Sequence, residues 1–286
     1  MIRHIPTLIV LLAVSLVASA EDKPMLKAPV GLQLYSLRAQ FQAEGVPKTL
    51  DRVKDLGFKY VELAGTYNLP PDKFKAMLDE RGLTPIAGHF AFDRFKSDPD
   101  GIASDAKALG LQYAGTAWVK GKDAFDEKYC REVAAAFNQA GKALADKGIK
   151  FYYHIHGYEF VPFGGDGGTL FDLLVKETDP QYVSFEMDIL WVVYPGQDPA
   201  KLLAKYPDRF CFTHLKDLRK GVQTGALTGN TDVRNDVALG TGQVDYPAVF
   251  RAAANSAVKY HFIEDESPTV LDQLPQSLRF LEQFKQ

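Results

Sequence analysis

Two histidines and a glutamate follow one strand-like segment of this sequence and could serve as metal ligands or proton-transfer groups. The segment runs from Lys150 to Phe160, and its aromatic first half leads into His154, His156 and Glu159. Residues two apart on a strand face the same side, so His154 and His156 could reach one cavity. A histidine after a single strand is often only a packed or capping residue, so this segment alone decides nothing.

The same pattern recurs, because a histidine or an acidic residue closes several other strand-like runs. These residues are Glu62, His89, Asp188, His214 and Glu264, with Glu186 two positions before Asp188. Burying so many titratable groups together would be costly without a cation. Imidazole and carboxylate ligands without thiolates fit Mn²⁺, Mg²⁺, Co²⁺ or Zn²⁺, and the pattern does not choose among them. The sequence therefore predicts a divalent-metal site.

Strands that alternate with helices must position these residues. At most junctions a helix ends at a glycine, and an aromatic or β-branched strand follows. Eight strand candidates result, at residues 30–35, 60–63, 85–89, 113–117, 151–156, 182–188, 210–215 and 260–264. Eight such units over about 250 residues are typical of a (β/α)8 TIM barrel.

A parallel barrel brings every strand end to one rim, so residues distant in the sequence converge there. The structural alternative is an open doubly wound sheet, which usually has fewer strands and a glycine-rich phosphate loop after its first strand. The corresponding turn here, at residues 35–38, reads YSLR and has no glycine. We therefore predict an α/β TIM barrel that forms a single domain over residues 21–286.

These motifs give the chain a resemblance to the xylose isomerase-like TIM barrels, also called the sugar phosphate isomerase/epimerase superfamily. That group includes ketose 3-epimerases, inosose dehydratase and endonuclease IV. The resemblance covers nearly all of the chain after the first twenty residues and is weak on substrate. It is carried by GLQLYSLR at 31–38, YHIHGYEF at 153–160, DILW at 188–191, HLKD at 214–217 and Glu264.

The resemblance implies a metal held by an acidic residue near strand five together with Asp188, His214 and Glu264. Relatives such as the ketose epimerases carry a glutamate on strand five itself, where this chain has His154. Glu159, a few residues further on, is the expected ligand. Direct binding of the metal by His154 is the alternative.

In such a site the metal would polarise an α-hydroxycarbonyl and stabilise an enediolate, so that the neighbouring C–H proton can be removed. Glu159 and Glu264 are the expected proton-transfer pair, with His156 as acid or base for a departing oxygen. Return of the proton on the opposite face would give an epimer, and loss of a β-oxygen would give dehydration or glycoside cleavage. We therefore predict a metal-dependent sugar isomerase or epimerase. The rivals are a lyase or dehydratase acting on keto-sugars or 3-keto-glycosides, and a non-catalytic sugar-binding barrel.

Further residues are expected to contact the carbohydrate, namely Glu62, His89, His154, Lys216 and Trp191. Lys216 lies two positions after His214 and would hold a hydroxyl or an oxyanion, or else pair with Asp217. Trp191 would stack on a sugar ring, although aromatic residues at strand ends often belong to the core.

The first twenty residues have the pattern of a secretory signal. Arg3 and His4 precede an apolar run at 8–17, and residues 18–20 form an A-x-A cleavage site. The run is shorter than the roughly 20 residues that cross a bilayer, so no membrane span is expected in a mature chain that begins near Glu21. We expect a periplasmic or secreted protein. Export argues against a phosphorylated substrate, because sugar phosphates are largely cytoplasmic.

Composition limits the partners and the cross-links. The formal net charge is -3 and no basic stripe is present, so nucleic acid is not an expected partner and a nuclease is disfavoured. Cys130 and Cys211 are too few for a disulfide framework. A buried free thiol is the simpler interpretation of Cys211, and a bond between the two is the alternative. The oligomeric state stays open, and a homo-oligomer is compatible with the sequence.

Overall fold

Eight parallel strands close into a barrel, which confirms the predicted fold. The computed structural model describes residues 25–119, 124–165 and 167–285, so the predicted signal segment lies outside the described residues. Around the barrel the order is β1-β10-β7-β6-β5-β4-β3-β2. The strands are β1 (Val30–Gln33), β2 (Tyr60–Leu63), β3 (Thr84–His89), β4 (Tyr113–Thr116), β5 (Lys150–His154), β6 (Val183–Asp188), β7 (Phe210–Leu215) and β10 (Tyr260–Ile263).

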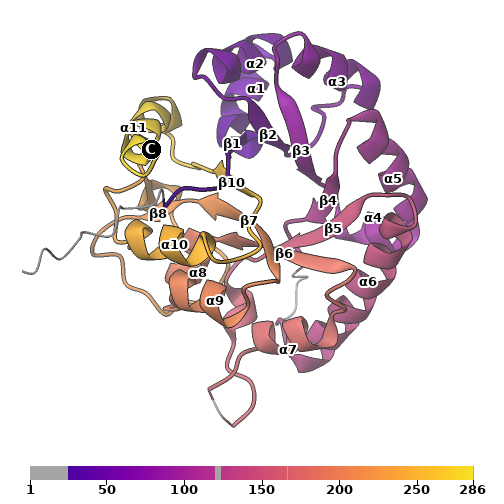
Figure 1. The fold of residues 1–286 in the computed structure, drawn as a ribbon, viewed down its shortest axis with the longest axis vertical. Helices are drawn as coiled ribbons and strands as arrows, with labels where there is room; N and C mark the ends of the chain where they lie inside the picture. The colour runs from indigo at the N-terminus through magenta and orange to yellow at the C-terminus, as the bar shows by residue number, and fades with distance from the viewer. Residues whose placement is uncertain (1–24, 120–123, 166, 286) are drawn as a thin grey trace, which may run out of the picture.

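Helices lie outside the strands and surround them (Figure 1). They are α1 (Arg38–Glu44), α2 (Val46–Asp55), α3 (Pro71–Asp79), α4 (Phe92–Ser97), α5 (Pro99–Ala108), α6 (Glu127–Ala145), α7 (Leu170–Glu177), α8 (Ile189–Val193), α9 (Pro199–Lys205), α10 (Tyr246–Ala253) and α11 (Val270–Glu282). Several begin at a side-chain cap. Asp98, Asp126 and Asp245, for example, each accept a hydrogen bond from a backbone N–H of the first turn. In the described part of the chain, no helix has the length and the apolar character needed to cross a membrane.

The alternation of side chains along each strand separates two layers of core. On β5, Phe151 and Tyr153 pack against Phe137 of α6, with ring centroids about 5 Å apart. Tyr152 and His154 face the other way, into the barrel, as the two-residue period of a strand requires. The catalytically useful side chains can therefore come only from the inward-facing set.

Large aromatic rings fill the barrel interior below its polar end. The ring centroid of Phe212 lies 5.2 Å from that of Tyr152 and 5.4 Å from that of Phe262. Two glycines make room for this packing. A Cβ on Gly115 would lie 2.5 Å from the Tyr152 ring, and one on Gly31 would lie 2.8 Å from the Phe262 ring. The dry aromatic floor leaves the carboxyl ends of the strands as the accessible end of the barrel.

After β7 the chain forms a short antiparallel pair, β8 (Asp217–Leu218) with β9 (Asp236–Val237). Asp217 accepts hydrogen bonds of 2.9 Å from the backbone N–H groups of Gly240 and Gly242, which fixes this segment beside the barrel end. Short 3-10 turns stand at η1 (Leu34–Leu37), η2 (Tyr158–Phe160) and η3 (Val233–Asn235). Cys130 and Cys211 are both buried, and they form no disulfide with each other.

Candidate functional site

Four buried side chains meet at the carboxyl ends of β5, β6, β7 and β10. They are His154, Asp188, His214 and Glu264, and one ligand atom from each lies within 4.8 Å of the others. We call these residues the four-ligand group. His154 and Asp188 end their strands, His214 is next to last in β7, and Glu264 directly follows β10. The barrel geometry therefore brings them together.

The separations within the four-ligand group suit a divalent cation. His154 Nε2 lies 3.0 Å from His214 Nδ1 and 3.5 Å from Asp188 Oδ2. His214 Nδ1 lies 3.2 Å from Glu264 Oε2 and 3.9 Å from Asp188 Oδ2. Ligands placed tetrahedrally at a usual bond length would be about 3.4 Å apart. Asp188 Oδ2 is buried without a hydrogen-bond partner, as expected of an oxygen reserved for a cation. The residues present therefore fit a metal.

A second group of polar side chains lies directly beneath the first. It consists of Glu62, His89 and Glu186, and we call it the lower carboxylate group. His214 joins the two groups, because its Nε2 lies 2.6 Å from Glu62 Oε2 and 3.1 Å from Glu186 Oε1. A carboxylate at one ring nitrogen fixes the tautomer and turns the lone pair of the other toward the cation position.

The lower carboxylate group is balanced by donors from neighbouring strands. Gln33 donates a 2.7 Å hydrogen bond to Glu62, and the Tyr152 hydroxyl donates to the other oxygen of the same carboxylate. His89 Nε2 lies 3.1 Å from Glu62 and 3.3 Å from Glu186. Burial alone would lower the pKa of His89, but the two carboxylates raise it to about 9. A protonated His89 then offsets part of the buried negative charge.

Lys216 supplies a fixed positive charge at the rim of the site. Its ammonium lies 2.9 Å from Glu264, 2.5 Å from Glu266 and 3.6 Å from Asp188. Burial would lower the pKa of Lys216, but these carboxylates hold it well above its usual range. The pairing with Asp217 that the sequence left open is not formed, since Asp217 accepts from the backbone of Gly240 and Gly242.

His156 is the free imidazole of the site. Its ring stacks on Trp191 at 5.3 Å and meets Trp118 edge-on at 5.0 Å. Burial holds the pKa of His156 well below its usual range, so the ring is neutral near pH 7. Its Nδ1 and the indole Nε1 of Trp191 are both buried without a hydrogen-bond partner. Neither atom is committed to a protein partner.

Glu159 is placed away from the four-ligand group, contrary to the expectation that it reaches back to a metal. Gly157, with φ of 90°, reverses the chain after His156 and carries Glu159 to the helix side of the barrel. There its carboxylate accepts hydrogen bonds from the Tyr153 hydroxyl and from the backbone N–H of His156. The strand-five position in the group is occupied by His154, the alternative that the sequence had left open.

A cavity of about 330 Å³ opens above the four-ligand group. It is lined by Tyr35, Ala64, His89, Ala117, Trp118, His154, His156, Glu264 and Glu266. A cavity of this size suits a small organic molecule. The residues that line it include two members of the four-ligand group and the free imidazole, so this cavity is the candidate active site.

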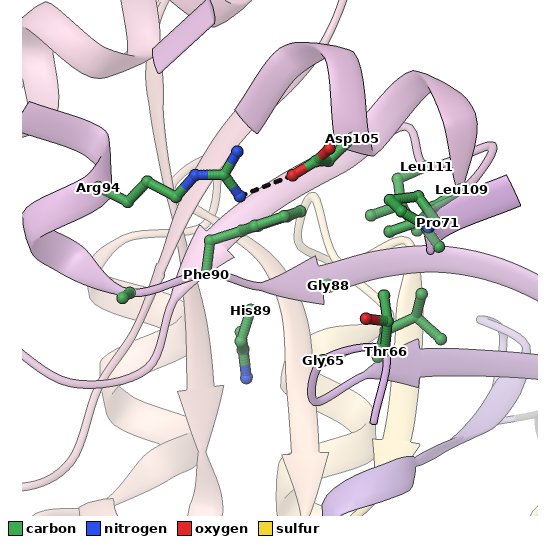
Figure 2. Close-up of a pocket in the computed structure, with 12 residues that line it drawn as sticks. Gly65, Thr66, Pro71, Gly88, His89, Phe90, Arg94, Asp105, Leu109 and Leu111 are labelled. Atoms are coloured by element: carbon green, nitrogen blue, oxygen red, sulfur yellow. Dashed lines mark hydrogen bonds and ion pairs between the residues drawn. The ribbon is translucent and has the colours of Figure 1, made fainter. Parts of the chain in front are cut away.

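A larger cavity, of about 420 Å³, lies on the helix side of β3 and is shown in Figure 2. The Arg94–Asp105 ion pair, at 2.6 Å, stands at its edge, and the His89 ring points away from Leu109 and Leu111. The ion pair satisfies its own charges, and the rest of the lining is mostly apolar. Size alone therefore does not identify the site, and the chemistry of the smaller cavity does.

Three supporting residues were not predicted as site residues. Gln33 and Glu266 carry a signal that period-two reasoning could have found, because Glu266 lies two positions after Glu264 and Gln33 is inward-facing on β1. Tyr152 carried no such signal, because an aromatic residue on a strand is usually part of the hydrophobic core. Glu186, which the sequence placed two positions before Asp188, lies in the lower carboxylate group.

Comparison with known proteins identifies relatives of this chain. A family model described as xylose isomerase-like TIM barrel matches residues 50–284. An inosose dehydratase of Clostridium botulinum is 28% identical over 183 residues, which are 58% of this chain and 57% of that protein. A second inosose dehydratase, from Geobacillus kaustophilus, is 24% identical over 71% of this chain and 74% of its own length. The chain thus spans little more than half of the first of these relatives.

Solved structures share the fold over nearly the whole chain. A sugar phosphate isomerase/epimerase from Parabacteroides distasonis is 25% identical, with a TM-score of 0.73 over 91% of this chain and 100% of its own. A protein named IolI, described with a bound zinc atom, is 11% identical, with a TM-score of 0.66 over 90% of this chain and 96% of its own. At that identity the second likeness concerns the fold alone.

Proposed function

The chain belongs to the family of xylose isomerase-like TIM barrels, and from this premise we propose that it is a divalent-metal-dependent enzyme that removes a proton next to a carbonyl of a carbohydrate. Two reaction classes share that step. In a dehydratase or lyase the removal is followed by loss of a β-oxygen, and in an isomerase or epimerase the proton returns to carbon. Of the two, we propose the dehydratase or lyase as the function.

The position of Glu159 carries this choice. An epimerase needs a proton-transfer group on each face of the substrate, and the expected pair was Glu159 with Glu264. The Glu159 carboxylate is instead bound by Tyr153 and by the His156 amide, on the far side of the strand from the cavity. One of the two expected proton-transfer groups is therefore missing from the cavity. The inosose dehydratases among the relatives point in the same direction.

Elimination needs only one group that first accepts a proton and then gives it up. The neutral His156 ring, with its free Nδ1 in the site, is suited to accept the C–H proton. Because its pKa is held low, the imidazolium so formed would be a strong acid and would pass the proton to the departing oxygen. Lys216, whose ammonium lies 5.8 Å from the Trp191 ring centroid and is bound by Glu264 and Glu266, adds positive charge nearby.

His154, Asp188, His214 and Glu264 are the residues that would hold the cation. A divalent ion bound there would polarise the carbonyl and stabilise the negative charge that develops on its oxygen. Glu264 is kept ionised for this role: burial would raise its pKa, but Lys216 and His214 hold it well below its usual range. Mn²⁺, Co²⁺ and Zn²⁺ suit this mixed donor set.

The test is turnover of keto-sugars, including an inosose, in D2O by protein stripped of metal and reloaded with Mn²⁺, Co²⁺ or Zn²⁺. We expect a metal-dependent unsaturated carbonyl product that is lost in Asp188→Ala and His156→Ala and is retained in Glu159→Gln. An epimer carrying deuterium would favour the isomerase instead. Binding without product or exchange in any metal form would favour a non-catalytic sugar-binding barrel.

The isomerase or epimerase is kept as the second candidate because of one observation. The Parabacteroides distasonis protein named as a sugar phosphate isomerase/epimerase matches 91% of this chain at 25% identity. Glu264 and His156 both line the cavity and would be the two proton-transfer groups in that case. The D2O experiment separates the two reactions by product.

We also propose that the protein is exported to the periplasm or secreted, on the signal-like pattern of residues 1–20. Export predicts a mature chain that begins near Glu21. N-terminal sequencing of protein recovered from the periplasmic fraction tests this. An intact N-terminus in the cytoplasmic fraction would refute it.

A further inference from the structure

Two exposed aromatic rings border the candidate active site. Tyr35 is 43% exposed and Trp118 is 44% exposed. In the described part of the chain only four large hydrophobic residues are this exposed, and the other two are Val233 and Leu271. Tyr35 and Trp118 line the same cavity. Exposed aromatic rings gathered at a cavity mouth are typical of a binding surface rather than of chance.

Both rings are held in place by their neighbours. Trp118 meets His156 and Tyr158 edge-on, at centroid distances of 5.0 and 5.2 Å. The Arg38 guanidinium lies 4.5 Å from the Tyr35 ring centroid. Rings fixed in this way lose little conformational freedom on binding, so they are ready-made platforms for a flat apolar group.

The charge of the cavity opposes an anionic ligand. Its lining carries Glu264 and Glu266, and no lysine or arginine among the described residues lines it. The nearest cations are engaged, because Lys216 is bound by carboxylates and Arg38 donates a 3.0 Å hydrogen bond to the Glu266 carbonyl. The protonated His89 of the lining is likewise paired, with Glu62 and Glu186. A phosphate brought beside Glu264 and Glu266 would therefore meet carboxylates without a free protein cation, which is costly.

We propose that the cavity takes an uncharged glycoside whose sugar ring lies over the four-ligand group and whose flat aglycone stacks on Trp118 and Tyr35. The aglycone is either an aryl group or the face of a second sugar ring, since both offer a flat apolar surface. Phosphorylated sugars are disfavoured. This inference rests on the proposed function, because it assumes that the cavity is a carbohydrate site.

The test is calorimetric binding to the metal-loaded protein of matched ligands that share one sugar. For glucose, galactose and xylose in turn, the set is the methyl β-glycoside, the 4-nitrophenyl β-glycoside and the β-linked disaccharide; glucose 6-phosphate is compared with glucose. We expect the aryl glycoside, the disaccharide or both to bind roughly tenfold more tightly than the methyl glycoside, and glucose 6-phosphate to bind more weakly than glucose. Which of the two binds more tightly identifies the aglycone.

Trp118→Ala and Tyr35→Ala should each remove most of that preference, measured within each variant as the ratio of its affinities for the aryl glycoside or disaccharide and for the methyl glycoside. Leu271→Ala, at an exposed apolar residue of α11 outside the cavity, is the matched control and should change neither. Equal binding of all glycosides, or tighter binding of glucose 6-phosphate than of glucose, would overturn the inference and leave the proposed function standing. Failure of every glycoside and free sugar to bind would overturn both.

Discussion

Replacing Glu159 with glutamine should make the stability of the protein less sensitive to rising pH. Burial raises the pKa of Glu159 from 4.5 to about 7, although the Tyr153 hydroxyl and the His156 amide donate to it. Between these two pH values the folded chain holds a proton that the unfolded chain has lost. The stabilisation by the protonated carboxyl is therefore complete below the unfolded pKa and is lost as the pH rises through the folded one.

The magnitude follows from the size of the pKa shift. At about 1.4 kcal/mol per unit, raising the pKa from 4.5 to about 7 corresponds to about 3 kcal/mol of unfolding free energy. Glu159 is fully buried, so solvent does not screen this effect. Most of it, about 2.5 kcal/mol, falls between about pH 5 and about pH 8. Glutamine has nearly the same shape and does not titrate. Between about pH 5 and about pH 8, the unfolding free energy of the variant should therefore rise by about 2.5 kcal/mol relative to that of the wild type.

The assay is urea unfolding of both proteins at a series of pH values and at equal metal loading. Other titrating groups contribute equally to both proteins and cancel in the difference. Glu80→Gln, at an exposed carboxylate, is the control and should follow the wild type. A difference that stays constant with pH would refute the placement of Glu159 in a dry pocket. Loss of bound metal in Glu159→Gln would return Glu159 to the role of ligand that the sequence had indicated.

Three further outcomes are expected. His154→Ala should reduce bound Mn, Co or Zn, measured by mass spectrometry, to below about a tenth of the wild type, as expected for loss of a ligand that orders the site; full retention would remove this residue from the metal site. Glu62→Gln keeps all four ligands but replaces the carboxylate whose Oε2 lies 2.6 Å from His214 Nε2, so metal affinity measured by chelator competition should fall roughly 10–100-fold; unchanged affinity would show that this carboxylate does not orient the ring. Gly115→Ala would place a Cβ 2.5 Å from the Tyr152 ring and should cost about 1–3 kcal/mol in urea unfolding. Gly165→Ala, with nothing within 4 Å of its new Cβ, should change stability by less than about 0.5 kcal/mol; equal effects would refute the packing argument.

The barrel was predictable because its units repeat. At most junctions a helix ends at a glycine and an apolar strand follows, so strand number and direction could be read from local patterns. The residue that closes each strand then converges on one rim whatever the details of the loops. His154, Asp188, His214 and Glu264 were all within reach of this reasoning, and the structure brings all four together.

Glu159 shows where such reasoning stops. Its distance from His156 along the chain allows either face of the barrel, and the choice depends on a single backbone turn at Gly157. A Cβ at Gly157 would lie 2.7 Å from the Trp191 carbonyl oxygen, so the turn is fixed by contact with the segment after β6. Contacts between segments more than thirty residues apart leave no local signal in the sequence.

The lower carboxylate group explains why the polar part of the barrel is two layers deep. A metal site needs only the four ligands, yet Glu62 and Glu186 are buried beneath them at a cost that Gln33, Tyr152 and His89 must offset. Packing does not explain why Glu62 and Glu186 are buried here, because apolar side chains would fill the barrel more favourably. They are accounted for if His214 must present one nitrogen upward and hold the other against a carboxylate. The depth of the polar layer is therefore evidence for ligand orientation, and hence for a bound cation, that is independent of the four ligands themselves.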